Sequence, residues 1–529
     1  MDEREPADAI YQTLIWSGAC GYDNRHVFDM KPINMDGRQH LKFHLSPYRE
    51  DDSLPANDRR ASGVVMDNSY QEVNRIVLQS NKTLDRHEFR PQPDGKKALI
   101  TTSWKTDKVA SELDQGQRSF LNTGFQEIDM STGRPIFDWD PWSHGVLVNE
   151  SCDLKSMQKS SGDWDWAHFN SVDKNFGGDY LVSSRHTSTI YKISGVDGSV
   201  IWRLGGCAGI SDFEMDDGVP FMWQHHARWR FENETHTVIS LFDNASEDED
   251  RNQGIEQGRS SGKIIMLDHV QHTARMLRRF DRPDGESSND LGSLQTLDQD
   301  VLTSRVLVNW GLQGYISEYD DQDRLVLEAK FLSDRHRTYR AYKYPWVGHP
   351  LEPPVLKVLP IAHSTNDVAS AFYVSWNGAT EVDSWAFYGG NILDEPFKLL
   401  STVRKHGFET SWVMAGAVRF AYAQGLDAKG QILGKSTTAS IVPVGKGDFK
   451  LKPSILNNVV TFDEFPIAPK TGSLSICKQT GSGASIPSSL FSFVVGVLAL
   501  FGLFGVARRA LDEVLRRQKG YKKVPTIFP

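Results

Sequence analysis

Apolar and polar positions alternate in short segments along the first two thirds of the chain. Alternation with a period of two predicts β-strands, and the Gly and Asp-Gly pairs between the segments supply the positive φ that hairpin turns need. The clearest copy therefore predicts a four-stranded antiparallel sheet. Its strands are expected at residues 168–173, 180–185, 188–193 and 199–204.

This strand pattern recurs about every 40 to 50 residues, and three copies open with a histidine. The histidine copies start at His87, His168 and His225, and a fourth copy starts at Leu294 without one. Another set of strands lies upstream, at residues 26–80, and residues 10–16 resemble only the end of such a set. A repeat of short strands with this period is typical of β-propeller blades. We infer six blades, the first of them either complete or truncated.

Alternating strands continue after the repeats, separated by Gly and Asn turns, and predict a small β-sandwich of the immunoglobulin or fibronectin kind. A proline-containing segment before them is expected to be a linker. Farther on, residues 488–507 hold no charge and are long enough to cross a membrane as a helix, and a basic tail follows. The predicted order is a propeller at 1–345, a linker at 346–364, a sandwich at 365–470, a Gly/Ser-rich stalk at 471–487, a transmembrane helix at 488–507 and a cytoplasmic tail at 508–529.

The basic tail predicts the orientation of the chain in the membrane. Positive residues favour the cytoplasmic side, which places the large N-terminal part outside the cell or in a lumen. The first residues are acidic and have no apolar signal region, so we expect that a signal peptide is missing from a truncated N-terminus. The alternative is insertion through the C-terminal helix with the body in the cytosol.

Composition and charge limit the kinds of partner that we expect this protein to bind. The formal charge of -9 is spread along 529 residues without a basic stripe, which argues against nucleic acid. The four cysteines form no CxxC pair, and a disulfide between Cys152 and Cys207 is one option. Four glycosylation sequons are compatible with export. They begin at Asn81, Asn149, Asn233 and Asn244.

The histidines at the first repeat position are the candidate chemistry. Side chains alternate along a strand, so His168 and Asn170 are expected to point the same way, with Arg185 at the end of the neighbouring strand. The register aligns His87 and His225 with His168 and places His226 on the opposite face. Arg228 is a further candidate for substrate binding. Packing could also explain a repeated histidine.

Two kinds of ligand fit histidines beside an arginine. A dianion such as sulfate or phosphate would accept forked hydrogen bonds from Arg185, whereas three imidazoles could hold a metal ion. The arginine and the absence of an aligned carboxylate favour the anion. A neutral histidine could then act as a nucleophile and a second one as general acid and base.

Several long motifs occur in an order that resembles the arylsulfotransferase family in its fungal, membrane-anchored form. They are DWDWAHFNSVD from Asp163, YLVSSRHTSTIYKI from Tyr180, VIWRLGG from Val200, SDF from Ser211, DRHEF from Asp85, Gln224-His225 and ISLFDN from Ile239.

The resemblance implies a six-bladed propeller enzyme that moves a sulfuryl group from a phenolic sulfate ester to a phenol through a sulfohistidine, without cofactor or nucleotide donor. It assigns catalytic roles to His87, His168 and Arg185, and the nucleophile to His225. The family's Gln-His-Asp is Gln-His-His here, so His226 competes for that role. A non-catalytic membrane-anchored propeller that binds an anionic glycan, phenol or protein stays open, as does a metal-dependent hydrolase.

Overall fold

The computed structural model is all-β in the residues it describes, which are 13–19, 21–22, 25–47, 60–106, 120–153, 163–207, 209–245, 259–331, 337–364 and 367–440. Three short 3-10 helices are the only helices of these ranges, and no helix among them is long and apolar enough to cross a membrane. The predicted transmembrane helix, the stalk and the tail lie outside the described residues.

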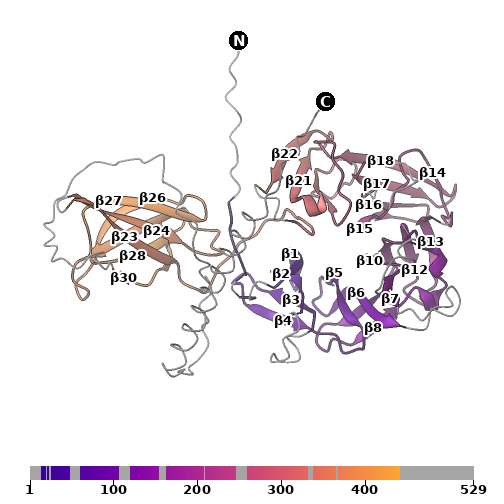
Figure 1. Cartoon of the computed structure of the whole chain (residues 1–529), viewed down its shortest axis with the longest axis horizontal. Coiled ribbons are helices and arrows are strands. Elements are labelled where there is room, and N and C mark those ends of the chain that lie inside the picture. Colours follow the sequence, from indigo (N-terminus) through magenta and orange to yellow (C-terminus); the bar gives the residue numbers. More distant parts are fainter. Residues whose placement is uncertain are drawn as a thin grey trace, which may run out of the picture. The chain divides into compact units, whose positions relative to one another are not determined.

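Five sheets of the propeller-like part follow one another along the chain, and in each of them four consecutive strands form an antiparallel meander. Figure 1 shows them around a common centre, with β1, β5, β10 and β15 innermost. The first two sheets are β1 (Val27–Met35), β2 (Arg38–Leu45), β3 (Ser62–Met66), β4 (Glu72–Ile76) and β5 (Thr83–Pro91), β6 (Lys97–Thr106), β7 (Phe120–Asp129), β8 (Pro135–Trp139), with β9 (Trp164–Asp165) paired to β7.

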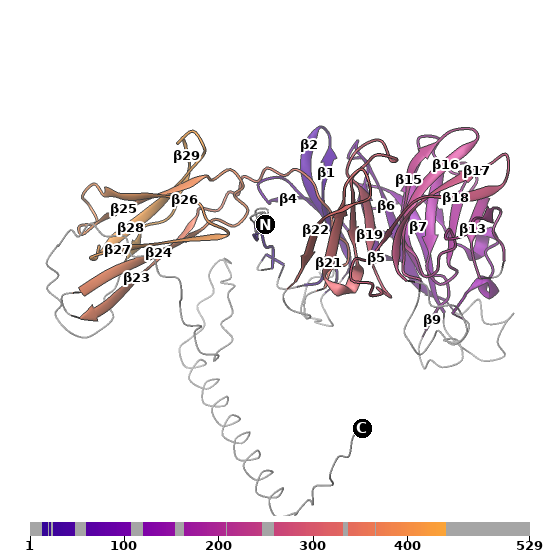
Figure 2. The same cartoon turned by 90° about the horizontal axis from the view of Figure 1, so that it is seen from above.

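The next three sheets repeat this order, and Figure 2 shows the same part of the chain turned by 90°. The third is the predicted blade, and the fourth gains one outer strand. Their strands are β10 (Phe169–Lys174), β11 (Tyr180–Ser184), β12 (Thr189–Ile193), β13 (Val200–Gly205); β15 (His225–Glu232), β16 (His236–Asp243), β17 (Ser261–Asp268), β18 (Thr273–Asp281) with β14 (Glu214–Met215); and β19 (Ser293–Thr296), β20 (Val306–Asn309), β21 (Tyr315–Tyr319), β22 (Leu325–Lys330).

Six blades are not confirmed, because the described residues form five blade sheets. The first sheet, β1 to β4, has all four strands, and residues 13–16, expected to end a blade, form no strand. Residues 337–344 instead join the fifth sheet to the first without forming a strand. The backbone N–H of Lys343 donates to the side chain of Gln295 at 2.8 Å, and the hydroxyl of Tyr342 donates to Asp29 at 2.7 Å.

Apolar side chains fill the spaces between neighbouring sheets. Phe125 of the second sheet and Val172 and Tyr180 of the third belong to one buried cluster, together with Trp139. Burial of such aromatic side chains contributes about 3 to 5 kcal/mol each, as judged from truncation to alanine. This packing fixes the positions of the innermost strands.

The sandwich begins earlier than the sequence predicts, because β23 occupies the second half of the expected linker 346–364. Pro360 lies inside β23, which pairs only with β24 and is therefore an edge strand, where a proline is tolerated. One sheet contains β23 (Val355–Ser364), β24 (Asp367–Ser375) and β27 (Glu409–Ala415). The other contains β25 (Ser384–Gly390), β26 (Lys398–Arg404), β28 (Phe420–Leu426), β29 (Ile432–Lys435) and β30 (Ala439–Ser440).

Candidate active site

His225, the first residue of β15, has a defined hydrogen-bonding arrangement. Its Nδ1 lies 2.7 Å from Oδ1 of Asn244. The amide nitrogen of Asn244 donates to the backbone oxygens of Ser288 at 2.7 Å and Leu291 at 3.1 Å, so the amide oxygen faces the ring. His225 therefore has its hydrogen on Nδ1 and a lone pair on Nε2. That Nε2 is buried and has no hydrogen-bond partner in the described part of the chain.

The surroundings of His225 keep its ring neutral. Burial lowers its pKa well below the ordinary value of 6.5, the carboxylate of Asp290 opposes this, and the positive charge of Arg185 lowers the pKa further. Oδ1 of Asp290 is 3.8 Å from Nε2. A neutral imidazole with a free Nε2 is the form that attacks an electrophile.

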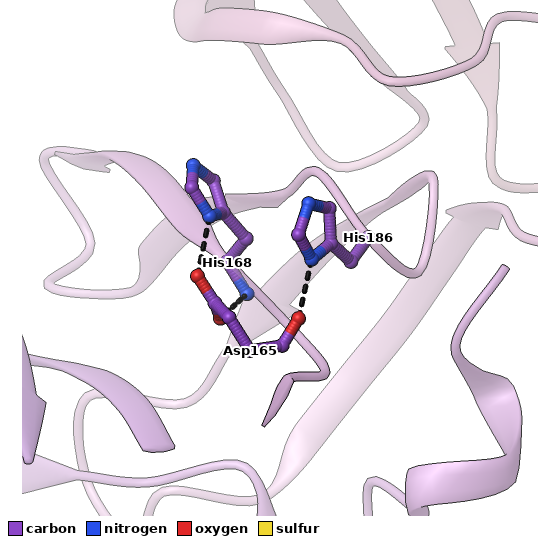
Figure 3. Close-up of side chains that lie close together, drawn as sticks. All are labelled: Asp165, His168 and His186. Atoms are coloured by element: carbon purple, nitrogen blue, oxygen red, sulfur yellow. Dashed lines mark hydrogen bonds and ion pairs between the residues drawn. The ribbon is translucent and has the colours of Figure 1, made fainter. Parts of the chain in front are cut away.

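His168 and His186 share Asp165 (Figure 3). Nδ1 of His168 lies 2.5 Å from the carboxylate of Asp165, and Nδ1 of His186 bonds to the backbone oxygen of the same residue. The two rings stack with centroids 4.6 Å apart. Burial lowers both pKa values well below the ordinary value, as do neighbouring positive groups. Both rings are therefore neutral near pH 7, with their hydrogens on Nδ1.

The same three residues have a spacing that could suit a metal ion, since one ligand atom of each lies within 4.8 Å of the others. However, Nη1 of Arg185 donates to Nε2 of His186 at 2.9 Å, so both ring nitrogens of His186 already have partners. A metal ion would have to displace a guanidinium.

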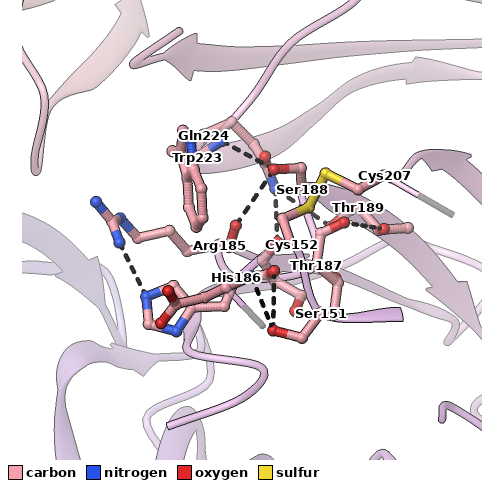
Figure 4. Close-up of a disulfide and its surroundings, with 12 residues drawn as sticks. Ser151, Cys152, Arg185, His186, Thr187, Ser188, Thr189, Cys207, Trp223 and Gln224 are labelled. Carbon is pink, nitrogen blue, oxygen red and sulfur yellow. Dashed lines mark hydrogen bonds between the residues drawn. A yellow bond between two sulfur atoms is a disulfide. The ribbon is translucent and has the colours of Figure 1, made fainter. Parts of the chain in front are cut away.

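Arg185 directly follows β11 and is fixed on several sides (Figure 4). Besides His186, its guanidinium donates to the backbone oxygen of Asn289 at 3.3 Å and lies 5.2 Å from the ring centroid of Trp223. The expected disulfide between Cys152 and Cys207 is present. It lies beside this arginine, because the backbone N–H of Cys152 donates to the oxygen of His186 at 2.6 Å.

His87 completes the group. It lies in a bulge of β5, and its Nδ1 bonds to the carboxylate of Asp85. Burial raises the pKa of Asp85, but the charge and hydrogen bond of His87 outweigh this, so the pKa is lowered and the carboxylate is ionised. The rings of His87 and His168 are 4.8 Å apart. We call His87, His168, Arg185, His186 and His225 the histidine cluster.

Four of the predicted site residues therefore lie together in the histidine cluster. His87 and His168 are in contact, and Arg185 reaches them through His186. The charges of Arg185 and His87 both act on the pKa of His225, which connects the fourth member. All four residues also neighbour Asp290, whose burial raises its pKa while these neighbours lower it more strongly.

The other two predicted residues have different partners. The amide of Asn170 donates to the backbone oxygen of Gln224 at 2.7 Å and accepts from the backbone of His226 at 3.3 Å. The strand register shifts between Phe169 and Ser171, and this bulge breaks the alternation that would have placed Asn170 beside the histidine. Asn170 thus joins β10 to β15.

Arg228 lies outside the histidine cluster. Its Nη2 forms an ion pair with the carboxylate of Glu88 at 2.5 Å, and both side chains are buried. His226 lies near it, with Nε2 3.2 Å from the hydroxyl of Tyr342, and shares no hydrogen-bond partner with His225. The two adjacent histidines therefore belong to different surroundings.

Several residues that orient this site were not predicted as site residues. Asp85, Asp165 and Asn244 lie in the motifs quoted above, two or three residues before a histidine or at the end of ISLFDN, and this proximity was the available signal. Asp290 lies in no motif, so only the fold reveals it. The sequon at Asn244 is also corrected, because its amide is buried and hydrogen-bonded, whereas Asn81, Asn149 and Asn233 are exposed.

The fold and the site define the class of this protein: an all-β, propeller-like chain in which histidines lie together with an arginine. The family model for arylsulfotransferase (ASST) matches residues 63–332, just over half of the chain, and the chain belongs to this family. No curated protein matches.

Solved structures give distant likenesses. The β-fructofuranosidase BmSUC1 of Bombyx mori is 12% identical, with 82% of this chain and 89% of that chain covered and a TM-score of 0.29. The GH93 α-L-arabinofuranosidase of Fusarium graminearum in complex with arabinobiose is 9% identical, with 68% and 91% covered and a TM-score of 0.31. TM-scores this low support no argument about the site.

Proposed function

We propose that this protein transfers a sulfuryl group from a phenolic sulfate ester to a phenolic acceptor through a sulfohistidine at His225. The observation that supports this most directly is the neutral ring of His225, with its hydrogen held by Asn244 and its buried Nε2 without a partner. Membership of the arylsulfotransferase family supports the reaction class.

In the first step, Nε2 of His225 forms a bond to sulfur as the bond from sulfur to the phenolic oxygen breaks. The departing oxygen takes a proton from Nε2 of His87, whose Nδ1 bonds to ionised Asp85. In the second step the acceptor hydroxyl returns its proton to His87, and its oxygen takes the sulfuryl group from His225.

Two further residues act on the group that is transferred. The guanidinium of Arg185 stabilises the negative oxygens of the sulfuryl group, and its stack on Trp223 limits its movement. Neutral His168 has a lone pair on Nε2, because its Nδ1–H is directed to Asp165, and this lone pair orients the acceptor hydroxyl.

The test is to trap the intermediate. The full-length protein is mixed with 4-nitrophenyl [35S]sulfate in the absence of an acceptor, and the labelled peptide is identified by mass spectrometry. We expect an acid-labile adduct on His225 that a phenol discharges. If the protein binds the ester but neither forms an adduct nor releases nitrophenol, the result would instead support the non-catalytic alternative, a membrane-anchored propeller that binds an anionic ligand.

A further inference from the structure

The innermost strands bring together a second set of charged residues, beyond the histidine cluster. Histidines lie at the start or middle of these strands, and cations lie farther along them. On β15, for example, Arg230 follows His225 by five residues, which is up to about 16 Å of strand. We call the six cations the basic cluster. They are Lys31, Lys42, Arg90, Arg228, Arg230 and Arg340.

Carboxylates neutralise only part of the basic cluster. Asp29 forms ion pairs with Lys42 and with Arg340, the latter at 3.1 Å. Glu88 pairs with Arg228 at 2.5 Å and with Arg340 at 3.4 Å, and Asp173 pairs with Arg90. Three carboxylates thus face six cations, which leaves a surplus of three positive charges.

Lys31 and Arg230 account for most of this surplus. In the described part of the chain neither has a carboxylate at ion-pairing distance. The ammonium group of Lys31 lies 4.9 Å from the ring centroid of Tyr342. Arg230 donates to the hydroxyl of Ser240 at 2.7 Å and to the backbone oxygen of Leu294 at 3.2 Å, both uncharged.

Lys31 and Arg230 both lie near His226. The ammonium group of Lys31 lies over the ring of Tyr342, the hydroxyl of that tyrosine lies 3.2 Å from Nε2 of His226, and Arg230 follows His226 on β15. In agreement with this, the charges of both lower the pKa of His226, after burial and the charges of Arg228 and Arg340. Their own pKa values are lowered by burial in the first place, that of Arg230 to about 10. Keeping surplus cations in poorly solvated surroundings costs free energy unless a negative partner compensates them.

Solvent can reach this neighbourhood. The side chains of Lys31, Arg90 and Arg230 are only partly buried, and Tyr344, whose ring centroid lies 6.2 Å from that of Tyr342, is 44% exposed. Buried Arg340 lies deeper, with its Nη2 donating to the backbone oxygen of Asn170 at 2.7 Å. A small anion could therefore enter from the side of Tyr344 and meet unpaired cations.

We propose that the basic cluster is a second anion-binding site, in which Lys31 and Arg230 bind a tetrahedral dianion such as sulfate or phosphate. An ammonium and a guanidinium both donate charge-assisted hydrogen bonds to such oxygens. The site is distinct from the histidine cluster, and it does not depend on the proposed reaction.

The experiment measures binding of inorganic sulfate and inorganic phosphate to the full-length protein by titration calorimetry at low ionic strength. We expect the double variant Lys31→Met/Arg230→Gln to lose at least about tenfold in affinity at one site. Arg185→Met should retain that site, since it removes the guanidinium of the histidine cluster only. The matched control is Lys429→Met/Arg404→Gln, which removes the same charges from exposed positions of the sandwich and should bind like wild type.

Two results would overturn the proposal. One is binding by the double variant that equals that of wild type, or absent from both. The other is a single site that disappears in Arg185→Met. Because an anion that binds only the folded state raises the melting temperature, the shift produced by sulfate gives an independent readout for each variant. The trapping experiment on His225 can fail without affecting either result.

Discussion

His225 and His226 are neighbours in the chain, both are buried, and both have pKa values well below the ordinary value, yet their surroundings differ. Asn244 holds the ring of His225 with Nε2 free, beside Arg185 and Asp290. His226 instead bonds to Tyr342 among the cations of the basic cluster. Burial alone thus makes a histidine neutral, whereas its partners decide whether a nitrogen is available for chemistry.

The largest expected effect is on kcat, where substitutions of His225 and His226 should differ. His225→Ala removes the proposed nucleophile and should lower kcat with an aryl sulfate and a phenol by about 10⁴-fold or more. His226→Ala should change kcat by less than tenfold, because among the described residues that ring bonds to Tyr342 and to no member of the histidine cluster. Initial rates of nitrophenol release measure both. Equal losses in the two variants would contradict the assignment of His225.

Loss of the disulfide should affect the histidine cluster but not the basic cluster. Replacing Cys152 and Cys207 with serine removes a constraint on the unfolded chain, which should lower the free energy of unfolding by about 3 kcal/mol. It should also lower kcat, since Cys152 holds the backbone of His186. Thermal melts and rates check this. Sulfate binding at the basic cluster should stay unchanged, and its loss would show that the histidine cluster and the basic cluster are not independent.

Asn244 should act through the orientation of His225. Asn244→Ala frees the ring to adopt the wrong tautomer, so kcat should fall by about 10- to 100-fold with little change in KM. Asn122→Ala is the matched control, because it removes another buried amide, one that accepts from Trp166 at 2.8 Å and touches no histidine of the cluster. A similar loss of kcat in both variants would mean that Asn244 only supports the fold.

Much of the fold could be predicted because the period-two pattern and the Asp-Gly turns are local signals. The strands of the third sheet lie within a residue or two of their predicted ends. Ring closure is not local. Residues 337–344 join the fifth sheet to the first through side-chain hydrogen bonds, and no alternating pattern in the sequence predicts this connection.

The site was predictable in its histidines but not in their partners. His87, His168 and Arg185 were recognisable by position in the repeat, whereas the bulge at Asn170 reverses a side chain that simple alternation assigned to the same face. Asp290 lies 65 residues from His225 in sequence and 3.8 Å away in space. Contacts of this kind depend on how neighbouring sheets pack.

The smallest effect concerns the property that the two histidines share. Each is neutral when folded and has an ordinary pKa of about 6.5 when unfolded, so the unfolded chain binds more protons below that pH, and stability falls as the pH is lowered.

Replacing either His225 or His226 with glutamine should therefore flatten this fall by about 1.4 kcal/mol per pH unit between pH 6 and 5. Urea unfolding at several pH values measures it, and exposed His26, replaced in the same way, is the control. The two histidines should give equal slopes here although they differ about 10³-fold or more in catalysis. A flat response for His226 alone would mean that it is protonated in the folded protein, and the basic cluster would then carry one more positive charge.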